Sequence, residues 1–329
     1  MWYGQMNGPD GQFDRAQQAA RRGLQARGDL LSLALLMNLA LLYLCQTVVA
    51  WAVVWWIRRM GLSTGAVEVI NELYTMVVYG AAFLPPYLLY ARVCRLPFRS
   101  LPSARPYPPV LAAGAGVTLG MSASSFLLGL GLNLFFALFG LYPMDIPLTL
   151  PGNPLAAVLF VVNIALLPAV VEELIFRGIV LQSLRPWGDG FAVAVSAVLF
   201  ALLHRNTAQF PNALLMGVAL GYFVVKTNSL WTSMLIHLAN NAFILILAVA
   251  SQEMGYLGQL AIQGLQMALY GLAGILGVWY LWHRRLDLRL PASRCPLPQR
   301  ECLSVYATRP LTLVLLAVFC GVFFLNFSR

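Results

Sequence analysis

The chain has 329 residues, of which 60% are hydrophobic and only 10% are charged, and its mean hydropathy is +0.75. A soluble globular protein is typically about 45–50% apolar and about 25% charged, so this composition excludes an ordinary cytosolic enzyme, a disordered regulator and a fibrous protein. The net charge of +9 does not indicate a nucleic-acid-binding surface, because most basic residues lie in short segments between apolar stretches. We therefore expect an all-α, polytopic membrane protein with lipid around it and no nucleic-acid partner.

Apolar stretches long enough for helices follow a polar segment of 29 residues. The predicted spans are about 30–57, 66–93, 110–142, 154–184, 190–205, 208–225, 228–250, 257–282 and 311–327. Because the second and the last have weaker flanks, we expect eight or nine transmembrane helices around a central cavity. Two glycine pairs with GxxxG spacing, Gly116 with Gly120 and Gly217 with Gly221, predict close helix contacts.

The distribution of Lys and Arg predicts the orientation. With nine spans and a cytoplasmic N-terminus, 17 of the 21 basic residues face the cytoplasm. The opposite side then receives Arg58, Arg59, Arg205 and Arg329. We expect an integral protein of a bacterial inner membrane, with its N-terminus inside and its cavity open to the cytoplasm.

Ionisable residues within the apolar stretches are the main functional signal. An Asp, Lys or Arg at the centre of a span costs about 2.5–3.5 kcal/mol to insert, so such residues are usually functional. The fourth stretch contains Glu172, Glu173 and Arg177. Glu173 and Arg177 are four residues apart, so they share a helix face and are expected to pair. Glu172 is rotated by about 100° from Glu173 and is expected to point into a cavity.

Two of the three histidines also belong to apolar stretches. His204 ends the fifth stretch, four residues after Phe200, and His237 lies in the seventh, four residues before Asn241. From the expected cytoplasmic ends, a rise of about 1.5 Å per residue places Glu172, His204 and His237 about 20, 21 and 14 Å deep. Three separate helices are therefore expected to bring a carboxylate, two imidazoles and an amide to a similar height.

In this order, the residues resemble the three motifs of the CAAX protease and bacteriocin-processing (CPBP) family. That family includes the CAAX prenyl endopeptidases and many bacterial Abi-type membrane proteins. The motifs are Glu172-Glu173-x-x-x-Arg177, Phe200-x-x-x-His204 and His237-x-x-x-Asn241. The resemblance covers about residues 154–248, and no motif residue is missing. It implies an intramembrane endopeptidase that cuts a membrane-associated peptide or the tail of a membrane protein.

The resemblance also implies a role for each motif residue. Glu172 corresponds to the base that activates water, and His204 assists it. His237 and Asn241 resemble the pair that stabilises the oxyanion, a task for which an imidazole and an amide on one helix face are suited.

Glu173 and Arg177 would hold the fourth helix in position.

The chain would then divide into a polar cytoplasmic segment (1–29), N-terminal transmembrane helices (30–150), a CPBP-like catalytic core (151–250) and C-terminal transmembrane helices with a basic loop (251–329).

The residues leave metal dependence open. Glu172, His204 and His237 offer two imidazoles and one carboxylate, which is a zinc-binding donor set, but the sequence has no HExxH helix. The family has been described both as metalloproteases and as glutamic proteases, and we expect the glutamic mechanism without a cofactor, with zinc as the alternative. A proton-coupled transporter and a non-catalytic immunity or scaffold protein are alternative functions. The sequence has no detectable inverted repeat, which disfavours the transporter.

Overall fold

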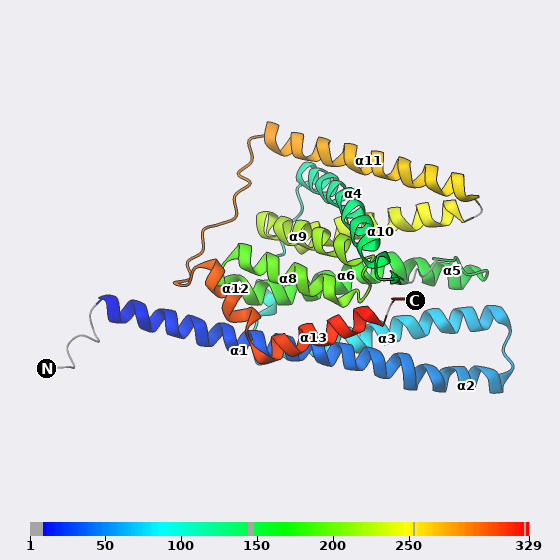
Figure 1. Ribbon diagram of the computed structural model, residues 1–329, viewed down its shortest axis with the longest axis horizontal. Helices are drawn as coiled ribbons and strands as arrows, with labels where there is room; N and C mark the ends of the chain where they lie inside the picture. The colour runs from blue at the N-terminus through cyan, green and yellow to red at the C-terminus, as the bar shows by residue number, and fades with distance from the viewer. Residues whose placement is uncertain (1–8, 144–147, 253, 326, 329) are drawn as a thin grey trace.

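The structure is a computed structural model that describes residues 9–143, 148–252, 254–325 and 327–328 (Figure 1). Residues 1–8, Asn326 of the last predicted span and Arg329, which contributes to the orientation count, lie outside the described residues. Within the described chain, the strands β1 (Tyr142–Pro143) and β2 (Phe327–Ser328) have two residues each and pair antiparallel. The predicted all-α class is confirmed.

All nine predicted spans are helical. In chain order the helices are α1 (Pro9–Leu44), α2 (Ala50–Met60), α3 (Thr64–Val93), α4 (Pro108–Ala137), α5 (Pro154–Val161), α6 (Leu167–Glu173), α7 (Leu181–Leu184), α8 (Asp189–Leu203), α9 (Phe210–Thr227), α10 (Leu230–Ser251), α11 (Tyr256–His283), α12 (Gln299–Ala307) and α13 (Pro310–Phe324). Three π-helical stretches, at Cys45–Val49, Val162–Leu166 and Leu174–Val180, join α1 to α2, α5 to α6 and α6 to α7. Short 3-10 turns occur at Phe98–Ser100 and Arg185–Trp187.

Seven of the helical segments in the described chain are long and apolar enough to cross a bilayer, and an eighth is added if α12 and α13, bent by 71°, form one span. A polytopic helical membrane protein is thus confirmed, with seven or eight spans where the sequence predicts eight or nine. The difference comes from α8, which has 15 residues and a length of about 22 Å, less than the hydrocarbon thickness of about 30 Å. Large apolar side chains on the outer helices, such as Leu127 and Ile275, are 69% exposed, as expected for a lipid-facing surface. The chain is an integral membrane protein.

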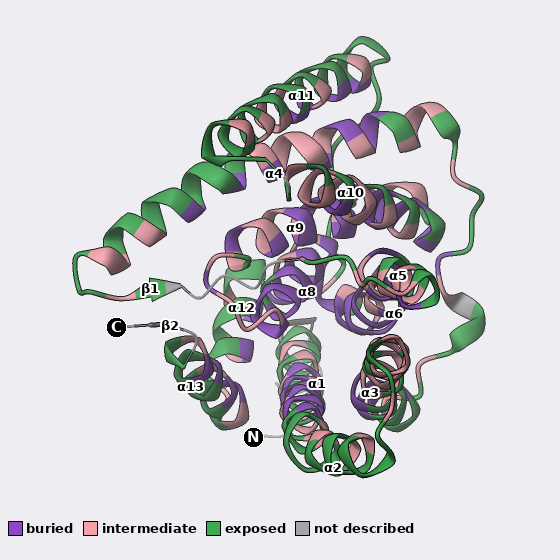
Figure 2. Ribbon diagram, turned by 90° about the vertical axis from the view of Figure 1, so that its right-hand side faces the viewer, coloured by how far each residue is buried: buried purple, intermediate pink, exposed green. Residues whose placement is uncertain are grey.

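The helices pack in layers around α8 and α6 (Figure 2). Helix α9 packs on α8, α4 packs on α9 and α10, and α11 covers the outer side of α4. On the opposite side, α1 packs against α3 and α13. Buried residues from distant parts of the chain, among them Leu31, Tyr87, Ile175 and Phe319, share one apolar core. This core surrounds the helix that carries Glu172.

Glycine determines how closely α4 approaches α11. A Cβ on Gly116 would lie 2.4 Å from the Ala273 carbonyl oxygen, and one on Gly120 would lie 2.7 Å from Gly274 Cα. Real Cβ atoms are not found at such distances, so both positions require glycine. The contact predicted from the first GxxxG pair is confirmed. At the second pair, a Cβ on Gly217 would lie 3.1 Å from Ala197 in α8, which is also a close approach.

Candidate active site

Glu172 and Glu173 are the last residues of α6, and the π-helical stretch Leu174–Val180 begins directly after them. Helices α5, α6 and α7 thus form one nearly continuous helix, as predicted, interrupted by two π-helical stretches. Such stretches widen the helix by one residue per turn and are frequent at functional sites. Here the second stretch, Leu174–Val180, lies between the two glutamates and α7. Within it, the Arg177 carbonyl accepts a hydrogen bond from the Gln182 side chain at 2.9 Å.

The predicted ion pair between Glu173 and Arg177 is present. Arg177 Nη1 donates to Glu173 Oε1 at 2.8 Å, and both side chains are fully buried. The guanidinium also donates to the Gly217 carbonyl at 3.2 Å and lies 4.4 Å from the centre of the Phe200 ring. The pair therefore ties the α6 helix to both α8 and α9. A buried charge is tolerated only with this kind of compensation.

His237, from α10, contacts both glutamates. Its Nδ1 lies 2.9 Å from Glu173 Oε1, and its Nε2 lies 3.9 Å from Glu172 Oε2. A carboxylate held by Arg177 can only accept hydrogen bonds, so Nδ1 is the donor in the first contact. This contact fixes the ring orientation and turns Nε2 toward Glu172.

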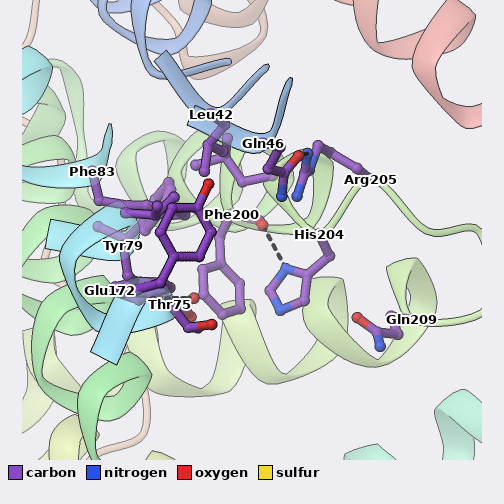
Figure 3. A pocket seen from close by; sticks show the side chains of 14 residues that line it. Leu42, Gln46, Thr75, Tyr79, Phe83, Glu172, Phe200, His204, Arg205 and Gln209 are labelled. Carbon is purple, nitrogen blue, oxygen red and sulfur yellow. Dashed lines mark hydrogen bonds between the residues drawn. The ribbon is translucent and has the colours of Figure 1, made fainter. Parts of the chain in front are cut away.

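His204 directly follows the last residue of α8. Its Nδ1 lies 3.0 Å from the Phe200 carbonyl oxygen, and its ring meets the Phe200 ring edge-on at 4.9 Å between centroids (Figure 3). The Phe200 ring also packs against His237 at 6.0 Å between centroids. One phenyl ring thus contacts both imidazoles, which come from different helices.

Asn241 is one turn beyond His237 on α10. Its Nδ2 donates to the Ile164 carbonyl at 3.3 Å, and its Oδ1 accepts from Asn240 at 3.4 Å. Ile164 belongs to the π-helical stretch Val162–Leu166. His237 and Asn241 therefore face the same neighbouring helix, as their spacing predicts. The Asn241 amide, however, is directed to that helix and is not among the side chains that line the cavity described next.

A cavity of about 290 Å³ holds Glu172 and His204 in its wall (Figure 3). Its inner wall is apolar and buried, with Phe176 and Phe200. Its outer wall includes the exposed side chains of Gln46, Thr75 and Gln209. Gln46 lies between α1 and α2, Thr75 on α3 and Gln209 between α8 and α9, so the cavity opens between these segments.

The loop between α8 and α9, which carries Arg205, lies at the mouth of this cavity. The sequence predicts an N-terminus in the cytoplasm and a cavity that opens to the cytoplasm, and both stay predictions.

Tyr79, from α3, is a site residue that the sequence motifs did not indicate. Its hydroxyl donates to Glu172 Oε1 at 2.5 Å, and its ring stacks on Phe83 at 4.4 Å between centroids. Thr75, Tyr79 and Phe83 are spaced by four residues and all line the cavity. The available signal was the presence of two hydroxyl side chains one turn apart in an apolar stretch, which places both on one helix face.

The three candidate zinc ligands do not converge. Among the described residues, no group of three or more His, Cys, Asp or Glu side chains is placed to hold a metal ion. Glu172 and His237 face each other, but His204 is not placed with them as a third ligand among the described residues. The arrangement of these side chains does not fit a three-ligand zinc site.

Comparisons with known proteins point to the same helices. A profile of the family described as "Type II CAAX prenyl endopeptidase Rce1-like" matches residues 154–243. A protein described as "Putative membrane peptidase YdiL", from Bacillus subtilis (strain 168), is 26% identical over 118 residues, which are 36% of this chain and 48% of that protein. The chain thus spans about half the length of this curated relative. No solved structure matches. These similarities cover the helices that carry the three motifs and support a CPBP/CAAX protease family for residues 154–243.

Proposed function

We propose that this chain is an intramembrane endopeptidase in which Glu172 activates a water molecule for attack on a peptide bond. The observation that carries the proposal is the position of the Glu172 carboxylate. One oxygen accepts a hydrogen bond from Tyr79, and the other, which is buried, lies 3.9 Å from His237 Nε2. A water that bonds both atoms at about 2.8 Å would sit at the corner of an angle of about 90°, which hydrogen-bond geometry permits.

In the proposed reaction, Glu172 takes a proton from water, and the resulting hydroxide bonds to the carbonyl carbon of the substrate. The carbonyl oxygen becomes negative and is stabilised by His237, which donates when Nε2 as well as Nδ1 carries a proton, and by Asn241, whose amide must leave the Ile164 carbonyl to reach it. The C–N bond then breaks, and the amine leaves with the proton that Glu172 received. His204 assists from the cavity wall.

The roles of Glu173 and Arg177 in this proposal follow from their contacts. Glu173 is held by Arg177 and binds His237 Nδ1, so the pair sets the direction of His237 Nε2. The buried ion pair thereby positions an imidazole that faces the reacting atoms.

We propose that the substrate is a membrane-associated peptide or the tail of a membrane protein and that no metal takes part. The N-terminus is proposed to lie in the cytoplasm of a bacterial cell, because most arginines lie in segments on that side. Helices long and apolar enough to cross the bilayer, with a cavity between them that holds Glu172, support a substrate that is itself held at the membrane.

The test is cleavage of a lipid-anchored peptide library by purified protein in nanodiscs. We expect Glu172→Gln to lower the rate by about 10²- to 10⁴-fold, the usual contribution of a general base. Glu301→Gln is the matched control, because Glu301 lies outside the cavity, where it pairs with Arg21 at 2.6 Å. The Glu301→Gln protein should cleave like wild type. A Glu172→Gln protein that is folded and cleaves at the wild-type rate would contradict the proposal. Proton-coupled uptake in proteoliposomes, or a cellular phenotype retained by Glu172→Ala, would instead favour the transporter or the scaffold protein.

A further inference from the structure

A groove runs over the side of the molecule that lies opposite α1, where α4, α9 and α11 meet (Figure 2). It consists of three adjoining cavities of about 320, 420 and 880 Å³. Tyr222 and Leu288 belong to the walls of the first and the second cavity, and Val117 and Val278 belong to the walls of the second and the third. The three cavities are therefore continuous, and they are separate from the cavity that holds Glu172.

The smallest cavity is the polar end of the groove. Its wall contains two cations, Arg105 and Lys226, and one carboxylate, Asp287. The Lys226 ammonium lies 3.7 Å from Asp287 Oδ2, and the Asp287 side chain is 78% exposed. An exposed ion pair at this distance is weak, and two cations outweigh one carboxylate. The polar end therefore has a net positive charge and attracts an anion.

Main-chain contacts bring the two cations together. The segment that carries Arg105 pairs with the turn between α9 and α10, because the Ala104 N–H donates to the Asn228 carbonyl at 2.9 Å. Asn228 has a left-handed φ of +49° and ends α9 two residues after Lys226. Asparagine is one of the residues that commonly end a helix in this conformation. The backbone thus holds Arg105 and Lys226 at one place.

The segment after α11 closes this end of the groove. The Tyr222 hydroxyl donates to the Leu288 carbonyl at 2.7 Å, and the Lys226 ammonium donates to the Arg289 carbonyl at 2.9 Å. The same segment carries Arg284 and Arg285, which are exposed like Arg289. These guanidinium groups add to the positive potential around the polar end.

The rest of the groove is apolar. Apart from the Tyr222 hydroxyl, the side chains that line the middle cavity are apolar, and they come from α4, α8, α9 and α11 and from the segment after α11. The largest cavity lies between α4 and α11, and its wall includes Trp279 and Trp282, which are 55% and 77% exposed. Exposed tryptophans are typical of the membrane interface. The groove thus leads from a cationic end into an apolar slot on the lipid-facing surface.

We propose that this groove binds an anionic phospholipid of the surrounding bilayer, with its phosphate at Arg105 and Lys226 and an acyl chain in the apolar slot. Basic pockets between membrane helices bind anionic headgroups, and a phosphate is a strong acceptor for both cations. The choline of a zwitterionic lipid would add a cation to a cationic site, so such a lipid binds less tightly. In the proposed orientation, the polar end lies in the cytoplasmic leaflet, whose surface is negative. The inference concerns binding alone and does not depend on the proposed proteolysis.

The experiment is native mass spectrometry of the full-length protein, delipidated in detergent and titrated with phosphatidylglycerol or phosphatidylcholine that has the same acyl chains. For wild type, we expect the first phosphatidylglycerol to bind about 10-fold more tightly than the first phosphatidylcholine. Arg105→Gln and Lys226→Gln should each weaken phosphatidylglycerol binding about 5-fold, and Asp287→Asn, which removes the opposing charge, should strengthen it. Arg22→Gln is the matched control, because Arg22 is exposed on α1 and does not line the groove. It should bind both lipids like wild type.

A second pair of variants tests the apolar slot. Val278→Trp fills the junction between the second and the third cavity, whereas Leu276→Trp adds the same side chain to an exposed position of α11 outside the groove. Val278→Trp should weaken the binding of both lipids about 10-fold, the effect of excluding about two methylene groups from the slot. Leu276→Trp should bind like wild type, and the unfolding temperature of each variant checks its fold.

Three results would overturn the inference. The first is equal binding of the two lipids by wild type, and the second is a preference for phosphatidylglycerol that persists in the double variant Arg105→Gln/Lys226→Gln. The third is unchanged binding by Val278→Trp, because the headgroup would then bind without a chain in the slot. Each of these results would leave the proposed proteolysis standing, since none of them measures cleavage.

Discussion

His237 Nδ1 lies 2.9 Å from Glu173 Oε1, and the opposite nitrogen of the same ring faces Glu172 Oε2 at 3.9 Å. Two consecutive carboxylates on one helix thus contact the two edges of one imidazole. Their functions differ because of their partners. Glu173 is fully buried and compensated by Arg177, whereas Glu172 is hydrogen-bonded by Tyr79 and lines the cavity.

Removal of Arg177 should destabilise the protein strongly. Arg177→Met leaves Glu173 as an uncompensated charge in the core, and such a loss costs about 3–5 kcal/mol. Thermal unfolding in detergent should show the loss, and the double variant Glu173→Gln/Arg177→Met should recover part of it. Arg21→Met, which removes the partly exposed partner of Glu301, should cost less than about 1 kcal/mol. Equal stability of the two arginine variants would contradict this prediction.

Tyr79→Phe should slow catalysis without unfolding the protein. It removes the hydroxyl that donates to Glu172 Oε1, and one hydrogen bond to a charged group is worth about 1.5–3 kcal/mol, or about 10- to 100-fold in rate. The measurement is kcat on a cleaved peptide, with the unfolding temperature as a check. Tyr87→Phe on the same helix is the control, since the Tyr87 hydroxyl has no hydrogen-bond partner among the residues that the structure describes. If both variants behave alike, the hydrogen bond does not contribute.

Gly120→Ala should weaken the packing of α4 on α11. The added Cβ would lie 2.7 Å from Gly274 Cα, and overpacking of this kind costs about 1–3 kcal/mol. Gly131→Ala on α4 is the comparison, because a Cβ there meets no atom within 4 Å. Thermal unfolding should show a lower midpoint for Gly120→Ala and an unchanged or higher midpoint for Gly131→Ala. The reverse order would show that the two helices are not in close contact in the protein.

Chelation should leave proteolysis unchanged. Glu172, His204 and His237 do not converge on one point among the described residues, so we expect purified protein to contain much less than stoichiometric zinc. Elemental analysis and activity after 1,10-phenanthroline treatment measure this. The prediction is contradicted if the protein contains stoichiometric zinc, if chelation removes both the zinc and the activity, and if His204→Ala also lacks the zinc. That result would show that the cavity rearranges around a metal.

Cysteine labelling tests the orientation. In a cysteine-free background, a membrane-impermeant maleimide should label Gln209→Cys in intact cells and Ser293→Cys only after permeabilisation. The expectation follows from the arginine count, which places the loop with Ser293 in the cytoplasm and the cavity mouth outside. The opposite labelling pattern would place the mouth of the cavity in the cytoplasm.

Local patterns in the sequence predicted the helices, the ion pair between Glu173 and Arg177, and the close contact at Gly116 and Gly120. Each depends on spacing along one helix or on the polarity of one segment, which a single sequence displays. The approach of His237 to Glu172 followed from comparing depths on separate helices. The fifth stretch, predicted over about 190–205, corresponds to α8, Asp189–Leu203, which is too short to count as a span.

Contacts between distant segments were not predictable in the same way. Tyr79 lies 93 positions before Glu172, and Asn241 lies 77 positions after Ile164, to whose carbonyl it donates. The local signal at Tyr79 is a second hydroxyl side chain, Thr75, one turn earlier, and it does not indicate which distant residue Tyr79 contacts. The Ile164 carbonyl that accepts from Asn241 lies in a π-helical stretch. Such a stretch depends on how the helix packs and has no simple residue pattern.

The length of the first helical segment has a consequence for the cavity. The segment Gln12–Met60 has 49 residues and a length of about 74 Å, more than twice the hydrocarbon thickness of a bilayer. Near one end, the Ala20 carbonyl accepts a hydrogen bond from Trp187 and Asp29 pairs with Arg309. Farther along, Gln46 contacts Arg205 at the mouth of the cavity. The helix therefore connects its contacts at Ala20 and Asp29 with the mouth of the cavity, so that a tilt of its N-terminal part would also move Gln46.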